Sequence, residues 1–525
     1  MNQKLLYIAC VAAGMFLASG CKKDFVSINT DPNHITASSM NFSYLFTSAE
    51  VFTAGNSDGN GYEDWRNNLI YSACMIQHLS STVSYWDGDK YLYNAAYNSA
   101  YWDENYPNAV NDIVEVITHT KTDTSQTNLY NITRIFKAFM FQRMTDMYGD
   151  CPYTQAGLGY DSNITSPVYD KQQVIYMDLL SELSEAAAAL NPNAANTVGA
   201  ADLLYGGNVA EWQKFAYSEM VRVAMRLSKV DPTDARKFVA MAVAGGVMTS
   251  ITDNAVLQHQ AIGGTPVQNG SGLILDGNDP DASRLSETFV NYLKSTNDPR
   301  LTYLGTVCVD PTVTTDMGDT TWAHQLGQPN GYDPAGSGSA FDLAGAPGYP
   351  GNPNTYSIVN RYTFSRVTAP TFFLTYGETS LLLAEAAQRG WISGTSAQTY
   401  YVNGVTGAMQ QLASQAGAGP NAASISAYLA ANPYNAADYL DQVNSQYWVA
   451  SFMDENESFA NWRRSGYPSL TPVANYPGNV TNGTIPRRFT YPQGEVATNT
   501  VNYNAAVADL AGGDKMTSRV WWDTQ

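Results

Sequence analysis

Charged side chains are scarce in this sequence. Asp, Glu, Lys and Arg make up 14% of its 525 residues, against about 25% in ordinary soluble proteins. The 28 basic residues are outnumbered by 47 acidic ones, which gives a formal charge of −19. Nucleic-acid binding depends on clustered Lys and Arg that contact phosphates, so this balance argues against a nucleic-acid partner. A surface rich instead in Asn, Gly, Ser, Thr and Tyr suits neutral polar ligands such as sugars or peptides.

Cysteines are also few, and none of the five forms a Cys-x-x-Cys pair. Two of them, Cys10 and Cys21, lie in the N-terminal segment. The other three, Cys74, Cys151 and Cys308, show no metal-ligand spacing, and an odd number allows at most one disulfide. Buried free thiols are therefore expected.

Long apolar runs are missing except at the N-terminus. Residues Leu5–Ala18 form an almost unbroken apolar stretch after a basic start, too short for a spanning helix of about 20 residues. Two small residues then lead to Cys21, an arrangement that resembles the bacterial lipobox, in which the thiol is acylated and cleavage falls just before it. We expect a signal peptide over residues 1–20, lipidation at Cys21 and a polar leash over residues 21–40. A plain signal peptide with an incidental Cys is the alternative.

The remaining residues, 41–525, are predicted to form a single all-α domain. Apolar residues recur at i, i+3, i+4 and i+7 in many segments. The clearest is Asn131–Met147, which Gly149 and Pro152 end. Further helices are expected at residues 43–52, 61–80, 94–118, 174–190, 209–227, 235–247, 371–388, 398–415 and 437–454. They come in neighbouring pairs, which is typical of a tetratricopeptide-type array, although the sequence signature of that repeat is absent.

Long polar segments, rich in Gly and Pro, separate some of these helices. They cover residues 257–283 and 306–362, and a further irregular tail covers 464–504. Loops of this length in a compact protein are usually functional or disordered. We therefore place ligand loops near residues 80–102 and 257–362.

Several short motifs stand out along the chain. They are Asn29-Thr30-Asp31-Pro32-Asn33, Asp146-Met147-Tyr148-Gly149-Asp150-Cys151-Pro152-Tyr153, Asp298-Pro299-Arg300-Leu301, Leu382–Trp391, Glu457–Pro468, Ile485–Pro492 and the closing stretch from Gly513 to Trp522. In composition and order they resemble the motifs of the SusD/RagB family of outer-membrane nutrient-binding lipoproteins from Bacteroidetes. The resemblance spans the whole chain.

This resemblance implies a mostly helical fold, in which four helix-pair repeats form a scaffold decorated with irregular loops. Members of the family act as lids on TonB-dependent outer-membrane transporters and capture oligosaccharides or peptides at the cell surface. The chain is thus expected to be a lipid-anchored, non-catalytic binder on the extracellular side of the outer membrane. A SusC-like TonB-dependent transporter is the implied partner.

Sugar binding needs flat aromatic faces surrounded by hydrogen-bonding groups. The segment Ser84-Tyr85-Trp86-Asp87-Gly88-Asp89 offers both in a loop between two expected helices, where family ligand residues commonly lie. Trp86 is the first candidate, with Tyr85 and Asp87 beside it. The long later loop supplies a second set, namely Trp322, Tyr332, Tyr349 and Tyr356. Packing or contact with the transporter is the alternative for each. Tyr93, Tyr97 and Tyr101, four residues apart, are interpreted as a packed helix stripe.

Other polar clusters receive structural interpretations. The arginines at 463, 464, 487 and 488 are predicted to stack on rings and pair with carboxylates, with Glu385 as one partner, rather than to bind ligand. Residues Asp276–Asp281 with Glu287 are dense in carboxylates, but Pro280 and Asp281 break the EF-hand pattern. A structural calcium there is considered, and no other cofactor is expected.

Two further functions remain open from the sequence. One is a secreted lipoprotein hydrolase that cuts glycans or peptides. The five histidines show no His-Glu-x-x-His spacing, but paired glycosidase carboxylates come together only in space and leave no such pattern. The other is a structural or adhesive surface protein.

Overall fold

The computed structural model describes residues 40–56, 59–332, 339–417, 419–473 and 476–524. Its contacts divide the chain into two units, Met1–Phe42 and Ser43–Gln525, and the account below concerns the second. The expected signal peptide, Cys21 and nearly all of the leash lie outside the described residues. They stay predictions.

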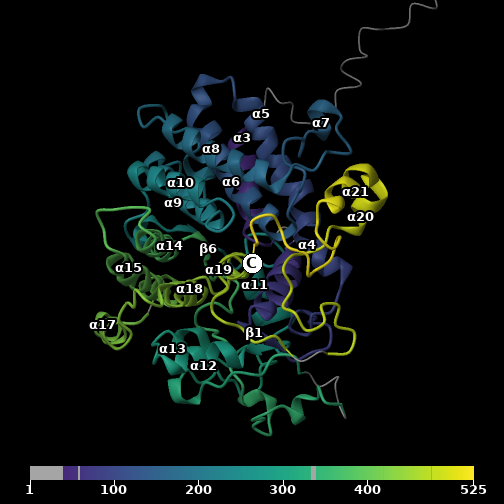
Figure 1. Cartoon of the computed structure of the whole chain (residues 1–525), viewed down its shortest axis with the longest axis vertical. Helices are drawn as coiled ribbons and strands as arrows, with labels where there is room; N and C mark the ends of the chain where they lie inside the picture. The colour runs from purple at the N-terminus through teal and green to yellow at the C-terminus, as the bar shows by residue number, and fades with distance from the viewer. Residues whose placement is uncertain (1–39, 57–58, 333–338, 418, 474–475, 525) are drawn as a thin grey trace, which may run out of the picture. The chain divides into compact units, whose positions relative to one another are not determined.

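Paired helices build the scaffold. Its elements are α6 (Thr127–Tyr148), α8 (Gln172–Ala189), α9 (Val209–Arg226), α10 (Pro232–Gly245), α14 (Tyr376–Gln388), α15 (Ala397–Gln410), α18 (Tyr439–Ala450) and α19 (Glu455–Ser465). Helix α6 packs on α8, α9 on α10, α14 on α15 and α18 on α19 (Figure 1). The predicted all-α scaffold of tetratricopeptide type is confirmed.

The other helices precede the scaffold or lie in the connections. They are α3 (Phe42–Thr53), α4 (Ala95–Asn105), α5 (Asn111–Thr120), α7 (Gly159–Ser162), α11 (Gly270–Leu273), α12 (Glu287–Ser295), α13 (Leu301–Leu304), α16 (Leu412–Ala416), α17 (Ala422–Ala431), α20 (Gln493–Thr498) and α21 (Thr500–Ala508). Three π-helical segments are η1 (Asp64–Ala73), η3 (Tyr106–Val110) and η7 (Ile274–Asn278). Short 3-10 turns include η2 (Gly88–Lys90), η4 (Thr124–Gln126) and η8 (Trp322–His324).

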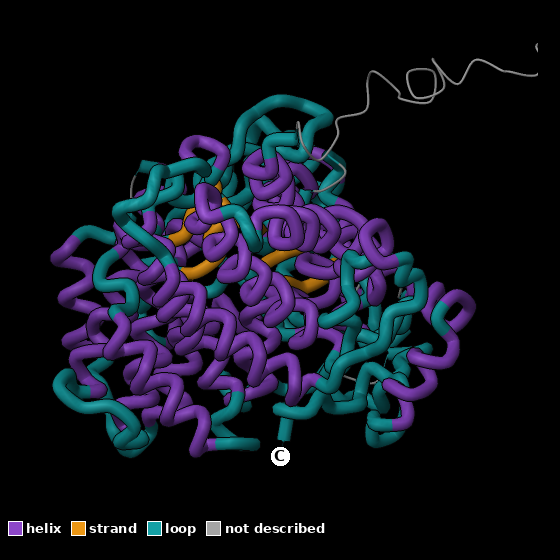
Figure 2. Tube along the Cα trace, turned by 90° about the horizontal axis from the view of Figure 1, so that it is seen from above, coloured by secondary structure: helices purple, strands orange, loops and turns teal. Residues whose placement is uncertain are grey.

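Three small antiparallel sheets fasten the connections. Strand β1 (Leu79–Ser81) pairs with β3 (Ser283–Leu285), with Leu79 opposite Leu285. Strand β2 (Ala255–Leu257) pairs with β6 (Thr371–Leu374), and β4 (Gly305–Thr306) with β5 (Ile358–Val359). Figure 2 shows them as short orange pieces among the helices. Each pairing joins residues far apart in sequence, so the long segments are held at several points.

Some expected helix boundaries are wrong. The helix predicted over 371–388 begins only at Tyr376, because Thr375 and Glu378 form a capping box there and the preceding Thr-Phe-Phe-Leu pairs as strand β6. The helix predicted over 61–80 ends early, since Gln77 adopts a positive φ of 59° before strand β1. Helix α12 lies between the two predicted long loops, and α20 lies in the tail predicted to be irregular.

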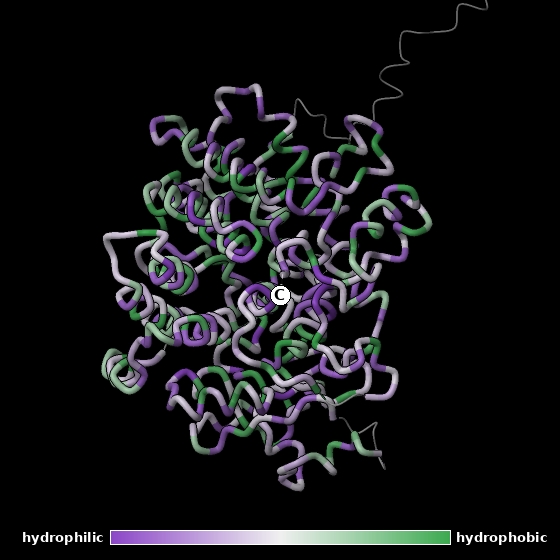
Figure 3. The backbone as a smooth tube through the Cα atoms, in the orientation of Figure 1, coloured by the Kyte–Doolittle hydropathy of each residue, from purple (hydrophilic) through white to green (hydrophobic). Residues whose placement is uncertain are grey.

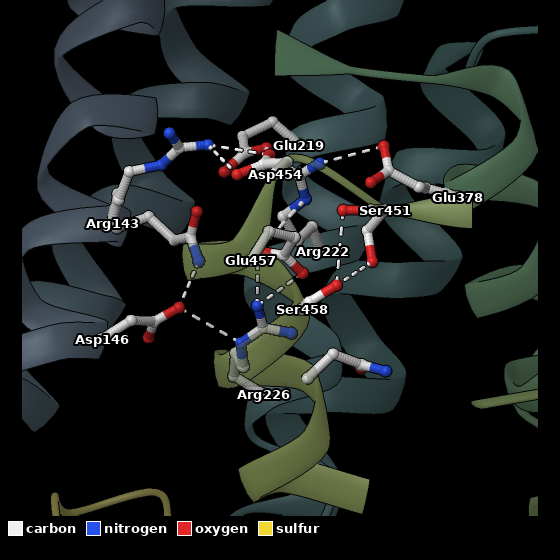
Figure 4. A network of polar contacts seen from close by, with 12 residues as sticks. Arg143, Asp146, Glu219, Arg222, Arg226, Glu378, Ser451, Asp454, Glu457 and Ser458 are labelled. Atoms are coloured by element: carbon white, nitrogen blue, oxygen red, sulfur yellow. Dashed lines mark hydrogen bonds and ion pairs between the residues drawn. The ribbon is translucent and has the colours of Figure 1, made fainter. Parts of the chain in front are cut away.

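A network of buried ion pairs joins four scaffold helices (Figure 4). Arg226 on α9 donates to both carboxylate oxygens of Glu457 on α19 at 2.6 Å and to Asp146 on α6 at 3.2 Å. Arg222 reaches Glu378 on α14 at 3.3 Å. Burial alone raises a carboxyl pKa, but Arg226 and Arg222 hold the pKa of Glu457 down at about 2. The carboxylate is therefore charged at the centre of the scaffold.

The C-terminal arginines are structural, as predicted. Arg464 forms a two-pronged pair with Glu385, both bonds at 2.9 Å, and Arg487 pairs with Asp523 at 2.8 Å. Arg488 also pairs with Asp514. Stacking adds to these pairs, with Arg463 over Phe459 at 4.2 Å and over Trp522 at 4.9 Å, and Arg488 over Tyr491 at 4.5 Å.

The three cysteines of the described chain, Cys74, Cys151 and Cys308, are free and buried, as expected. Among the described residues, no helix is both long enough and apolar enough to cross a membrane. Figure 3 shows the reason, because polar and apolar residues alternate along the helices.

Removing one partner from the buried network should destabilise the fold strongly. Arg226→Met leaves Glu457 without its two-pronged partner, and breaking a buried pair in this way costs about 3–5 kcal/mol. Arg134→Met is the control, because Arg134 pairs with Glu182 at the partly exposed surface, where a pair contributes about 0–1 kcal/mol. Urea unfolding of both variants checks this, and equal losses in the two would contradict the assignment.

Candidate functional site

Four aromatic side chains and one arginine form a partly exposed cluster, which we call the aromatic patch. It consists of Tyr62, Trp65 and Arg66 at the start of η1, Tyr85 in the loop before η2, and Tyr97 on α4. The rings of Trp65 and Tyr85 meet edge to face, with centroids 6.5 Å apart. The Arg66 guanidinium lies 3.5 Å from the Tyr62 ring centroid, 5.1 Å from Trp65 and 5.8 Å from Tyr97. Tyr85 is the most open of these residues, with 42% of its surface exposed.

Asp279 holds the patch together from the loop after η7. Its carboxylate accepts from the Tyr85 hydroxyl at 2.6 Å, from Trp86 Nε1 at 2.8 Å and from Trp65 Nε1 at 3.2 Å. Hydrogen bonds to a charged acceptor are stronger than neutral ones. Burial and the bond to Asp279 raise the pKa of Tyr85 well above its usual value. The hydroxyl therefore stays protonated and fixes the direction of the exposed ring.

Trp86, the first candidate from the sequence, does not offer a ring to solvent. Its side chain is fully buried, and its indole N–H is used by Asp279. The neighbouring Gly88 explains the burial, because a Cβ at that position would lie 2.0 Å from the carbonyl oxygen of Ile70. The loop is thus clamped on η1, which turns Trp86 inward and leaves Tyr85 outside.

Asp87 lies at the edge of the same loop and is partly buried. Burial raises its pKa to about 6, against the opposing effects of the Lys90 charge and the Asn94 side chain. Lys90 itself is buried and donates to the carbonyl of Val83 at 2.8 Å. Asp87 therefore changes charge close to neutral pH.

The second set of candidates is not assembled with the first. Tyr356 is buried in a small hydrophobic cluster with Leu343 and Ala346, and Tyr332 and Tyr349 pack against it. Trp322 lies apart on η8, where the Lys294 ammonium sits 5.5 Å from its ring. Within the described residues, no ring contact joins these side chains to the aromatic patch. Packing accounts for the three tyrosines, which we call the tyrosine cluster, and their role in ligand binding stays untested.

The carboxylates of the considered calcium loop point to protein groups. Asp276 lies 3.5 Å from Arg361, Asp281 lies 2.5 Å from Arg284, and Asp279 accepts from the aromatic donors. In the described part of the chain, the residues with metal-ligand geometry are elsewhere, at Glu115, His119 and Asp161. Calcium at residues 276–281 stays an untested expectation.

Tyr62, Trp65 and Arg66 were not predicted as site residues from the sequence. They lie inside a segment expected to be an ordinary amphipathic helix, and only the succession Tyr-Glu-Asp-Trp-Arg signals a polar, aromatic start. Asp279 was singled out for its charge, but its role depends on partners about 200 residues away in the chain. Burial varies along the predicted tyrosine stripe, since Tyr101 is buried while Tyr93 is 42% exposed.

Comparison with known proteins places the chain in a family. The sequence model of SusD-like proteins, described as starch-binding and associating with the outer membrane, matches residues 32–492. This chain belongs to the SusD-like family. No curated protein sequence matches it.

Several solved structures share the fold over nearly the whole chain. A chitin-binding protein is 32% identical, with 92% of this chain and 100% of that chain covered and a TM-score of 0.79. A SusD-like protein from Bacteroidetes is 30% identical, covers 93% and 100%, and has a TM-score of 0.80. A chitin-binding SusD homologue from Flavobacterium johnsoniae shares the fold at 21% identity, with 91% and 98% covered and a TM-score of 0.74.

The raised pKa of Asp87 predicts a pH-dependent stability. The folded pKa of about 6 exceeds the unfolded value of about 3.9, so the folded state holds an extra proton between them. The stabilisation is complete below about pH 4 and is lost as the pH rises through 6. Asp87→Asn should therefore be more stable than the wild type at pH 7.5 and equal to it at pH 4.

Thermal unfolding from pH 4 to pH 7.5 measures this difference. Asp123→Asn is the control, since hydrogen bonds from Ser125 lower the pKa of exposed Asp123. Its contribution changes only below about pH 4, so its difference from the wild type should be nearly flat over this range. A flat difference for Asp87→Asn across this range would contradict the assignment.

Proposed function

We propose that this SusD-like protein captures a neutral oligosaccharide on the aromatic patch and passes it, without catalysis, to a TonB-dependent transporter. The observation that carries the proposal is the exposed Tyr85 ring, held beside Trp65 by the Asp279 carboxylate. Sugar rings present an apolar face that stacks on aromatic rings and a rim of hydroxyls that need donors and acceptors. The patch supplies both.

Pre-organisation favours binding at this position. The Tyr85 ring is fixed by its hydroxyl, so little side-chain freedom is lost when a ligand arrives. Arg66 is partly exposed while its guanidinium stacks on Tyr62. The terminal N–H groups of the guanidinium can therefore donate to a ligand hydroxyl. A neutral glycan uses both groups without the cost of burying a new charge.

A glycan is preferred to a peptide as the ligand. The family is described as starch-binding, and two of the similar structures are named as chitin-binding. The scarcity of charged side chains, at 14%, also suits uncharged sugars. A peptide remains the other ligand class, and the same binding experiment tests it.

The membrane anchor and the transporter are the further parts of the proposal. Lipidation of Cys21 would tether the binding domain to the outer membrane, and several acyl chains together make such a tether effectively permanent. The family's association with the outer membrane supports this placement. Cys21→Ala should leave the protein out of the membrane fraction, and co-purification from membranes identifies the transporter.

Hydrolysis is the competing function. Both classes of glycosidase need two free carboxyl groups on either side of the scissile bond. In the aromatic patch the Asp279 carboxylate already accepts three hydrogen bonds, which makes it a poor acid or base. Incubation of the purified protein with maltoheptaose, N-acetylchitohexaose and a peptide mixture tests this, because any cleavage product would contradict a purely binding role.

Loss of the exposed ring should weaken glycan binding. Tyr85→Ala and Trp65→Ala are each expected to lower the affinity about tenfold, equivalent to about 1.4 kcal/mol, as for other aromatic anchors. Tyr85→Phe keeps the ring and should retain most of the affinity. Calorimetry with maltoheptaose and N-acetylchitohexaose measures the change.

Tyr160→Ala is the matched control, because Tyr160 on α7 is 83% exposed and lies outside the patch. Its affinity should equal that of the wild type. If Tyr85→Ala binds as well as Tyr160→Ala does, the aromatic patch is not the site.

A further inference from the structure

A polar cavity lies next to the aromatic patch, inside the protein. It is lined by residues from α3, η1, α4, α6, α11, β6, α14, α16 and the turn between α18 and α19, and it offers about 70 Å³ of space. This is too small for a sugar ring, since ligand pockets have about 300–1,000 Å³. The cavity is therefore separate from the proposed glycan site.

Four buried side chains on the lining of this cavity carry polar atoms that have no hydrogen-bond partner among the described residues. They include the Tyr101 hydroxyl, Gln411 Oε1 and both amide atoms of Gln415, none of which has a hydrogen bond to any described residue, and the Thr53 hydroxyl on the same lining is a fourth such group. Tyr101 is 4% exposed, Gln411 7% and Gln415 1%. Polar groups buried to this degree are nearly always hydrogen-bonded, and an exception calls for an occupant. Because these groups line the same cavity, one occupant or one group of occupants can satisfy them all.

Water fits the space and the chemistry. A buried water needs at least about 10–15 Å³ and two to four polar partners, so the cavity has room for a few molecules. The Tyr101 hydroxyl and the Gln415 amide both donate and accept, as water itself does. An apolar occupant would leave these groups unsatisfied.

The charged groups around the cavity favour a neutral occupant. Burial raises the pKa of Asp64 to about 7 and that of Glu378 to about 7, so each is partly protonated near neutral pH. Asp454 is paired with Arg143 at 2.8 Å. Glu63 is the remaining acidic group of the lining. The net negative charge of the cavity lining is thus smaller than its number of carboxyl groups indicates.

We propose that this cavity is an internal binding site for a cluster of water molecules, and that the cluster together with Asp64 positions the aromatic patch. Asp64 lines the cavity, and the next two residues along η1 are Trp65 and Arg66 of the patch. The site goes beyond the proposed function, because it binds no glycan.

The connection from the cavity to the patch is short and tightly packed. Asp64 accepts from the backbone N–H of Ser271 at 2.8 Å, and Ser271 is the second residue of the α11–η7 segment, which ends next to Asp279. A Cβ at Gly55 or Gly270 would lie 2.3 Å or 2.6 Å from the Asp64 carboxylate. Because there is so little free space around Asp64, a change in the cavity is expected to shift η1 or α11. Such a shift moves Trp65 or Asp279 and so disturbs the hydrogen bond between them.

Crystal structures of the full chain test the occupant. The wild type should show ordered waters within hydrogen-bonding distance of the Tyr101 hydroxyl and the Gln415 amide. Tyr101→Phe and Gln415→Leu should each lose the water that the deleted group holds. Gln398→Leu, at an exposed position of α15, should keep them all. A collapsed cavity with a direct bond between Tyr101 and Gln415, or an anomalous peak there after a rubidium soak, would overturn the assignment.

Amide hydrogen exchange of the same ligand-free variants tests the positioning role. Gln415→Leu and Tyr101→Phe should each speed exchange at residues 64–66 and 271–279 at least tenfold, with Gln398→Leu unchanged. Tyr101→Phe loses a single oxygen atom, so it serves if Gln415→Leu fails to fold. Unchanged exchange in Tyr101→Phe would refute the positioning role. Neither experiment uses a glycan, so the result is independent of the proposed function.

Discussion

The ion pair between Arg226 and Glu457 is the contact on which the arrangement of the scaffold depends. It joins α9 to α19, and the same arginine extends the connection to Asp146 on α6. Burying a charge costs hydration free energy, and a buried charge without its partner is strongly destabilising. Each member of the ion pair therefore requires the other to be present. The four helices therefore have to meet in one arrangement, and paired apolar faces alone would not specify it.

The network reaches the aromatic patch through α19. This helix packs on η1, where the Asn68 side chain accepts from the backbone N–H of Glu455 at 3.0 Å and Ser72 donates to Asn456 at 2.8 Å. Because η1 also carries Trp65 and Arg66, the scaffold fixes one side of the patch. Asp279, at the end of η7, fixes the other. The patch is thus formed where a rigid scaffold meets a loop tied down by β1 and β3.

Periodicity was sufficient to predict the paired helices, since apolar faces repeat locally. The position of Glu385 on an apolar helix also led to its prediction as a partner for a C-terminal arginine, here Arg464. Contacts between segments far apart in the sequence could not be predicted from such local patterns. The buried Trp86 donates its indole N–H to Asp279, which lies 193 residues away in the sequence, and no local pattern indicates this contact. The same holds for β6, whose partner β2 lies more than 100 residues earlier. Residue type singled out this loop, but only the fold determined which of its rings faces solvent.

The account rests on the claim that the aromatic patch, and not the tyrosine cluster, receives the glycan. A crystal structure of the protein with a bound oligosaccharide tests this most directly. The account predicts a sugar ring stacked on Tyr85, with a hydroxyl within hydrogen-bonding distance of Arg66. A sugar bound over Tyr332 and Tyr349 or on Trp322, with the patch empty, would contradict it.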